Sequence, residues 1–97
     1  MESKIKSLLV QKEEVSSLHF PQDDVLFLKD DQSRRKKRLD DAFALGNIEH
    51  EKVKILFQDI EGLKRVETTI WGVTDKSIIL KKGVVIPIHR IVKIDLI

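Results

Sequence analysis

From residue 51 to the end of the chain, apolar and polar residues alternate in short runs, and this pattern constrains the fold more than any other feature. In the first run, residues 52–58, Val53, Ile55 and Phe57 occupy alternate positions, as the buried side of a strand requires. Similar runs cover residues 64–74, 77–81, 84–88 and 90–97. Five short strands in succession, joined by tight turns, predict an antiparallel meander.

Glycine and proline divide this region at positions that suit a small, curled sheet. Gly62 follows Asp59 at the first turn, where a residue with positive φ fits. Gly72 interrupts the second run and predicts a bulge or a sharp bend. Pro87 has no N–H to donate, so we expect its strand at an edge or a bulge. A meander of this length closes most economically into a five-stranded antiparallel SH3-like barrel, because closure removes unpaired edges.

Residues 31–45 are predicted to form the main helix. Leu39, Ala42 and Phe43 follow the i, i+3, i+4 spacing of a buried stripe, which we expect to cap one open end of the barrel. The fold class is therefore mainly β with an N-terminal helix, an α+β domain. The residues expected at the helix ends are Asp30 or Asp31 as the N-cap, and Gly46 with Asn47 as the C-terminal stop.

A chain of 97 residues is long enough for one domain. We assign residues 31–97 to the helix and barrel. Residues 1–30 show only weak helical spacing, diluted by Lys, Glu and Ser, and are expected to be flexible or loosely ordered. The sequence has no cysteine, no apolar run that could span a bilayer and no secretory signal. These features predict a cytoplasmic protein without disulfides and without a membrane partner.

The sequence lacks the residue constellations that enzymes use. His19, His50 and His89 are far apart and have no metal-ligand spacing. The adjacent aspartate pairs do not make a carboxylate dyad, because neighbouring residues on a helix do not face each other. No phosphate-binding or nucleophile motif occurs. We therefore predict no catalytic residue, no metal site, no cofactor and no enzymatic activity.

Two short stretches carry a resemblance to a known family. Residues 62–81 combine a turn glycine, a long strand, an acidic turn and an apolar strand, and Ile88-His89-Arg90-Ile91 holds a basic pair between aliphatic residues. Both resemble the motifs of the Sm-like family, whose architecture is shared by bacterial Sm-type RNA chaperones and a small Rho-binding antiterminator. Residues 47–97 also resemble short uncharacterised bacterial proteins. The resemblance implies RNA contacts from the turn at Lys76 and from the basic pair.

Five consecutive cations at residues 34–38 form the only strongly basic segment of a chain whose formal net charge is +2. Such a segment could neutralise phosphates. The alternative is a solvated helix face whose cations pair with Asp40, Asp41 and nearby acids, and we weight it slightly higher. The residues expected to contact nucleic acid are Arg34, Arg35, Lys36, Lys37, Arg38, Lys64, Arg65, Lys76, His89 and Arg90.

We therefore expect a non-enzymatic small β-barrel binding module, with RNA or a nucleic-acid-associated protein as its partner and a regulatory role. The alternative is a protein–protein interaction or self-assembly module, forming a homo-oligomer through edge strands or through the tail around Leu26 and Phe27. Trp71 could stack on a base or anchor a partner, although packing in the core or under the helix is favoured. Salt separates the two functions, because phosphate binding weakens steeply with ionic strength and apolar association does not.

Overall fold

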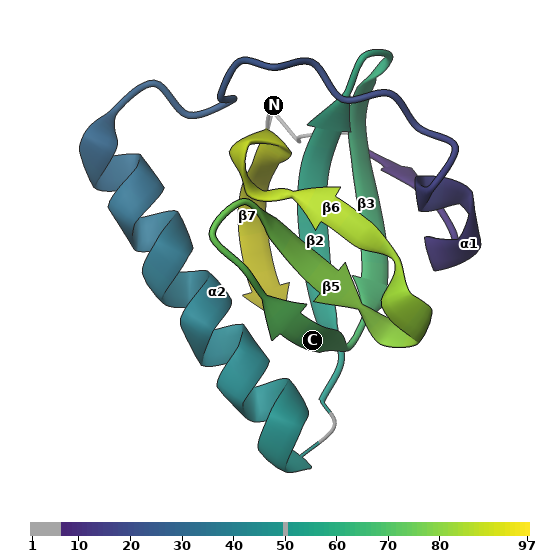
Figure 1. The fold of residues 1–97 in the computed structure, drawn as a ribbon, viewed down its shortest axis with the longest axis vertical. Helices are drawn as coiled ribbons and strands as arrows, with labels where there is room; N and C mark the ends of the chain where they lie inside the picture. Colours follow the sequence, from purple (N-terminus) through teal and green to yellow (C-terminus); the bar gives the residue numbers. More distant parts are fainter. Residues whose placement is uncertain (1–6, 50) are drawn as a thin grey trace, which may run out of the picture.

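The computed structural model describes residues 7–49 and 51–97, with side chains for all of these except residues 45–49. It confirms an α+β fold that is mostly strand, with one long helix beside the sheets (Figure 1). The elements in chain order are β1 Leu8–Leu9, α1 Lys12–Val15, α2 Lys29–Glu49, β2 Val53–Asp59, β3 Gly62–Thr68, β4 Ile70–Val73, β5 Ser77–Leu80, the 3-10 turn η1 Lys81–Gly83, β6 Val85–Pro87, the 3-10 turn η2 Ile88–Arg90 and β7 Ile91–Leu96.

The strands of the described residues form two open sheets, so the prediction of a closed five-stranded barrel is wrong. One sheet has the order β1-β3-β2-β7 and the other the order β4-β5-β6. The predicted second strand divides at Thr69, whose carbonyl accepts a hydrogen bond from the Lys81 N–H at the start of η1. η2 separates β6 from β7, and the short β1 adds a parallel pair to β3. The count is therefore seven strands instead of five.

The strand residues that alternation predicts to face inward do form the core. Val53, Ile55 and Phe57 of β2 have no exposed surface, and their register with β3 and β7 places β2 in the middle of the larger sheet. Ile78 and Leu80 of β5 face the same core from the small sheet. The outward positions between them are partly exposed, as a sheet with one solvated face requires.

Turn and bulge predictions are confirmed, but the position of Trp71 is not. Gly62 has a φ of 142°, and Pro87 lies in β6, an edge strand of the small sheet. The pairing of β4 with β5 shifts between Ile70 and Gly72, which leaves Trp71 as the extra residue. Trp71 is 54% exposed. The expectation of core or helix-covered packing was therefore wrong, because Trp71 keeps the outward phase of the residue after the buried Ile70, and the bulge does not reverse it.

The helix α2 carries the predicted stripe but extends further than expected. Leu39 and Ala42 are buried and Phe43 is half-buried, and α2 packs against β4 and β7, one strand from each sheet. The helix continues through Gly46 to Glu49, so the predicted stop is wrong. A glycine within a helix costs only about 1 kcal/mol, which does not by itself end it. Because α2 begins at Lys29, the aspartates expected to cap it lie inside its first turn, where negative charge favours the helix dipole.

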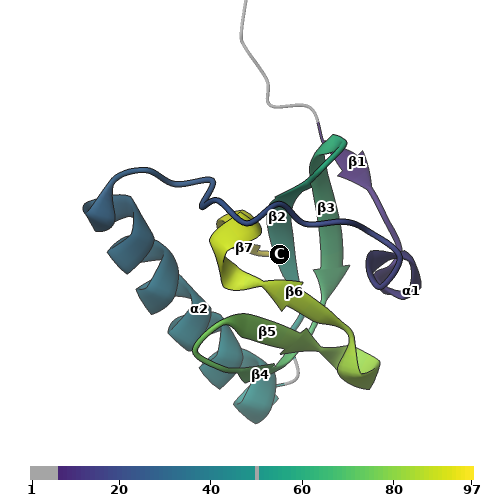
Figure 2. The same cartoon turned by 45° about the horizontal axis from the view of Figure 1, so that its top comes forward.

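The segment before α2 lies against the sheets. We call residues 18–28 the strap, which leads from α1 to α2 across β3 and β2 in the view of Figure 2. The Phe20 ring centroid lies 6.0 Å from that of Phe57. Before the strap, Val10 and Val15 are buried in the same core. The predicted flexibility of residues 1–30 stays a prediction, and residues 1–6 lie outside the described part of the chain.

Candidate binding surfaces

The cations predicted on α2 do not act as one surface. Arg35 is buried, and its guanidinium donates to both carboxylate oxygens of Asp24 at 2.9 and 2.8 Å and to the Ile91 carbonyl at 3.0 Å. It therefore fastens the strap and β7 to the helix. The exposed cations pair along the helix: Arg34 with Asp31 at 2.8 Å, Lys36 with Asp40 at 3.3 Å and Lys37 with Asp41 at 3.5 Å.

Arg38 differs from its four neighbours. It is exposed and forms no ion pair within the described residues. The predicted basic segment thus divides into one structural arginine, three exposed ion-paired cations and one exposed arginine whose charge is available to a ligand.

Three of the cations predicted on the strands also have structural partners. Lys64 is buried and donates to Asp59 at 2.6 Å and to Glu61 at 2.8 Å. Arg65 donates to the Ser7 carbonyl at 2.6 Å. Arg90 is buried, and it donates to the carbonyls of Gln58 and Asp23 at 3.0 and 2.7 Å.

Lys76 and His89, two of the residues for which the resemblance implied RNA contacts, lie beside one hollow, whereas Arg90 is buried elsewhere. The Ile88 N–H donates to the Lys76 carbonyl, and both Lys76 and His89 line a hollow of about 530 Å³ beside the strap. His89 Nε2 donates to the Pro21 carbonyl at 2.8 Å, so this ring also holds the strap. Asp24 and Asp75 line the same hollow and balance its cations.

The structural ion pairs shift the pKa values of their members. Hydrogen bonds from the Arg35 guanidinium lower the pKa of Asp24. Burial opposes ionisation of Asp59, but hydrogen bonds from Lys64 and from two backbone N–H groups outweigh it and lower the pKa of Asp59. The same contacts, with Asp59 first and Glu61 second, raise the pKa of Lys64.

These shifts predict how the stability of the fold depends on pH. A carboxylate with a lowered pKa in the folded state stabilises it above the unfolded pKa of about 4, and this stabilisation is lost as the pH falls through the folded value. Lys64 stabilises below its unfolded pKa of about 10.4 and loses its effect as the pH rises through its folded pKa. Urea midpoints should therefore form a plateau from about pH 5 to 10 and fall on both sides. Asp59→Asn should flatten the acid limb, and an unchanged wild-type midpoint between pH 7 and 3 would contradict this account.

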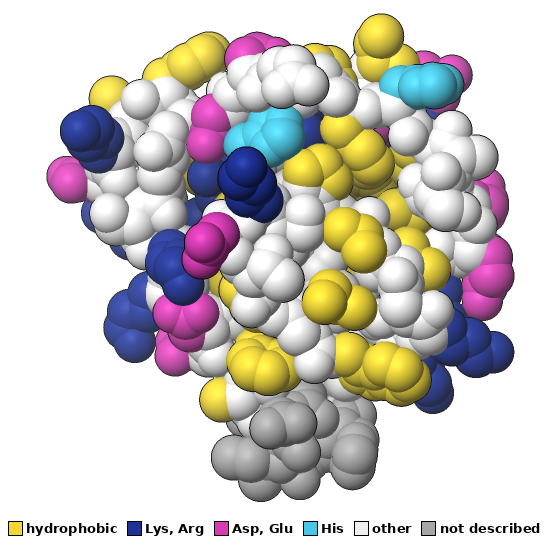
Figure 3. Space-filling view, in the orientation of Figure 1, with side chains coloured by type: hydrophobic (Ala, Val, Ile, Leu, Met, Phe, Trp, Pro, Cys, Tyr) yellow, Lys and Arg dark blue, Asp and Glu magenta, His cyan; other side chains and the backbone are white. Residues whose placement is uncertain are grey.

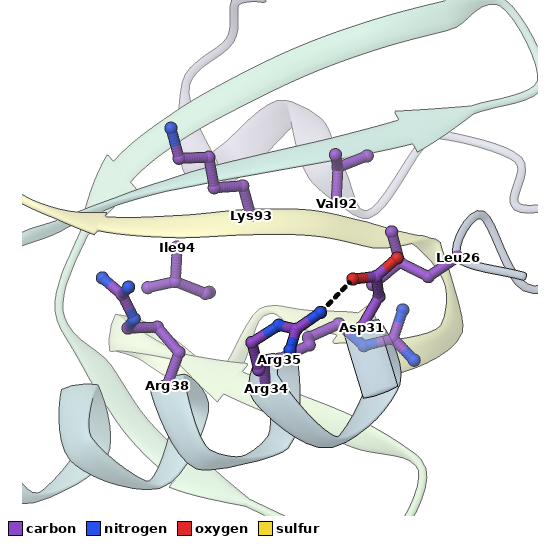
Figure 4. A pocket seen from close by; sticks show the side chains of 8 residues that line it. All are labelled: Leu26, Asp31, Arg34, Arg35, Arg38, Val92, Lys93 and Ile94. Carbon is purple, nitrogen blue, oxygen red and sulfur yellow. Dashed lines mark hydrogen bonds and ion pairs between the residues drawn. The ribbon is translucent and has the colours of Figure 1, made fainter. Parts of the chain in front are cut away.

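A groove lies between α2 and β7, and we call it the α2–β7 groove (Figure 4). One part has a cavity volume of about 210 Å³, and a second part of about 390 Å³ shares Arg34 and Arg38 with it and continues to Leu96. The residues that line the two parts are Leu26, Asp31, Arg34, Arg35, Lys37, Arg38, Asp41, Ala42, Val92, Lys93, Ile94 and Leu96.

The walls of this groove have different chemistry. Arg34 and Arg38 project from the α2 side, and Ile94 of β7 is turned toward the helix in Figure 4. Val92 and Lys93 extend to the other side of β7 and form its outer rim. Five cationic and two acidic side chains line the groove, together with Leu26, Ala42, Leu96 and the two aliphatic residues of β7. Ala42 and Ile94 are buried in the core, so the apolar surface of the groove comes from Leu26, Val92 and Leu96, beside an excess of positive charge.

A second exposed surface is the outer face of the small sheet. Ile79 pairs with Gly72 and Val85 across the three strands, and Trp71 lies beside them. Ile79 fills the space above Gly72, since a Cβ there would lie 3.3 Å from its Cδ1 atom. Hydrophobic side chains gather on the face that Figure 3 shows, where β5 and β6 lie in front. These outward residues carry no charge.

Sequence reasoning named Leu26 in a candidate interaction tail but missed the other residues that organise the groove. Asp24, which holds Arg35, lies in a stretch without periodicity, and Val92 and Ile94 read only as strand residues. The spacing of Arg34 and Arg38, one helical turn apart, was the available signal, because such cations share a helix face.

The described residues contain no group of three or more His, Asp or Glu that could hold a metal ion, and none of the helices they form is long and apolar enough to cross a membrane. Comparisons of the chain with protein-family models, with curated proteins and with solved structures gave no match.

Proposed function

We propose that the chain is a non-enzymatic binding module that holds a segment of a partner protein in the α2–β7 groove. The observation that carries this proposal is the combination of exposed cations on α2 with aliphatic side chains of the strap and β7 in one groove. Protein interfaces have apolar centres and polar rims, and they are enriched in arginine.

A cytoplasmic location and a likeness to the Sm-like family stay part of the proposal. The order of a long helix followed by short antiparallel strands supports that likeness.

A protein fits the groove better than a nucleic acid does. Four of the ten cations predicted to contact RNA, Arg35, Lys64, Arg65 and Arg90, are bound to acceptors within the chain. The three other cations of α2 that pair do so with aspartates, so α2 does not present its cations as one row for a phosphate backbone. None of the described residues that line the groove is aromatic, so base stacking there would fall to the arginine guanidinium planes alone.

An amide titration tests the proposed function. The ¹⁵N-labelled chain is titrated with a pool of short, scrambled-sequence peptides made of Asp, Glu, Leu and Val, and separately with mixed-sequence single-stranded RNA. The peptides should shift the amides of residues 26, 31–42 and 91–96, and RNA should leave them unchanged at 0.15 M salt, a concentration of about physiological ionic strength.

A matched pair of variants locates the site. Arg38→Glu should weaken peptide binding about tenfold, because it reverses a charge on the groove wall, and Lys36→Glu should change it less than about twofold. Lys36 is exposed on the same helix and pairs with Asp40, but it does not line the groove. Equal losses in both variants, or RNA binding that competes with the peptides, would favour a phosphate-binding function instead.

Self-assembly is the other form of the protein-binding alternative. It would use the uncharged face around Trp71, where Val85 and Ile79 add apolar surface. A sedimentation coefficient that rises with protein concentration, and that Trp71→Ser returns to the monomer value, would favour it over the groove.

A further inference from the structure

We infer, on the premise of the proposed function, that the α2–β7 groove selects an extended segment with acidic residues at alternate positions. The spacing of the cations carries this inference. Arg34 and Arg38 are four residues apart on α2, which is a rise of about 6.0 Å along a helix. In an extended strand, residues i and i+2 lie on the same side and are about 6.6 Å apart. Two carboxylates of such a segment can therefore meet both guanidinium groups at once.

The two arginines are available for this role. The side chain of Arg34 is 73% exposed, and its bond to Asp31 is an exposed pair of the kind that contributes at most about 1 kcal/mol. Arg38 has no ion pair within the described residues, so a carboxylate that binds it displaces nothing. Lys37 and Lys93 add positive charge at the two rims. Charge complementarity thus favours an acidic ligand, because the cationic side chains of the groove outnumber Asp31 and Asp41.

The opposite wall favours an extended backbone. Among the described strands, β7 pairs only with β2, so its second edge has no strand neighbour. An edge strand presents N–H and C=O groups that an added strand can use. Arg35 already occupies the Ile91 carbonyl and α2 packs against β7, so a bound segment can use only the edge groups that the helix leaves free.

The positions between the acidic residues of the bound segment are expected to hold aliphatic residues. In an extended segment they point away from the cationic wall, toward the β7 side. Ile94 is buried beside the helix, and Leu26 and Leu96, which line the two parts of the groove, offer the apolar contacts. The segment that fits best therefore alternates acidic and aliphatic residues. The same alternating sequence would not fit as a helix, because residues two apart on a helix do not share a face.

Two peptides of identical length, composition and net charge test the inference. One alternates Glu and Val, and the other has all of its Glu residues before all of its Val residues. Fluorescence anisotropy of labelled peptides is measured with the wild-type chain, with Arg34→Ala/Arg38→Ala and with Lys36→Ala. We expect the alternating peptide to bind about tenfold more tightly, and this preference to disappear in the double variant but not in Lys36→Ala. Circular dichroism of each variant verifies the fold.

The outcomes separate this inference from the proposed function. Equal affinities for the two peptides, both weakened in the double variant, would overturn the spacing and leave the groove as a protein-binding site. A preference for the alternating peptide that survives in the double variant would overturn the assignment to Arg34 and Arg38. Absence of binding by either peptide and by the scrambled pool would overturn both proposals.

Discussion

Phe57→Ala should lower the free energy of unfolding by about 3–5 kcal/mol, a large fraction of the 5–15 kcal/mol that typically stabilises a domain. Phe57 has no exposed surface and is one of the largest fully buried side chains. It belongs to β2, which pairs with both β3 and β7, and its ring lies against Phe20 of the strap. The cavity left by alanine would thus weaken the contact between the larger sheet and the strap. Urea unfolding, followed by circular dichroism, measures the change.

Phe27→Ala is the matched control for this substitution. Phe27 is 89% exposed, so the same truncation should change the free energy of unfolding by less than about 0.5 kcal/mol. Similar losses in the two variants would show that the core does not centre on Phe57.

Asp24→Ala should lower the free energy of unfolding by roughly 3 kcal/mol, the low end of the cost of breaking a buried ion pair. The Arg35 side chain is 6% exposed, and without Asp24 its charge keeps only the Ile91 carbonyl as an acceptor. Asp24 is itself partly exposed, which keeps the cost at that low end. The strap would lose its side-chain tie to α2.

The double variant Asp24→Ala/Arg35→Met distinguishes the loss of the attraction between Asp24 and Arg35 from the cost of leaving the Arg35 charge buried without its partner. Removing both charges leaves apolar surface in their place, so the double variant should be more stable than Asp24→Ala alone. Asp31→Ala is the control, since it breaks an exposed pair and should cost less than about 1 kcal/mol. A double variant as unstable as the single one would contradict the account.

The strands could be predicted because their period is a local property. Val53, Ile55 and Phe57 bury the face that alternation requires, and Gly62 turns the chain where expected. The division of the second strand at Thr69 has no local signal, since the Thr69 carbonyl bonds to Lys81 of the turn η1, twelve residues further along the chain. Trp71 was misplaced because a bulge at Gly72 was expected to reverse its side, whereas Trp71 keeps the outward phase that alternation after Ile70 gives it.

The binding residues were harder to predict than the strands. Arg34 and Arg35 are neighbours with the same chemistry, yet one is exposed and the other is buried. Arg35 lies four residues before the buried Leu39 and therefore on the same buried face of the helix, whereas Arg34 does not. The partners of Arg35 and Arg90 lie 11 and 67 residues away in the sequence, where no spacing rule connects them.

The strap is held largely through its main chain. His89 and Arg90 bond to the carbonyls of Pro21 and Asp23, and the Val25 N–H donates to the His89 carbonyl. Main-chain groups are the same for almost every amino acid, so these anchors tolerate nearly any residue. Most residues of the strap can therefore be substituted during evolution without a change in the path of its backbone. Phe20 and Asp24 act through their side chains, so we expect substitutions to be rare at these two positions.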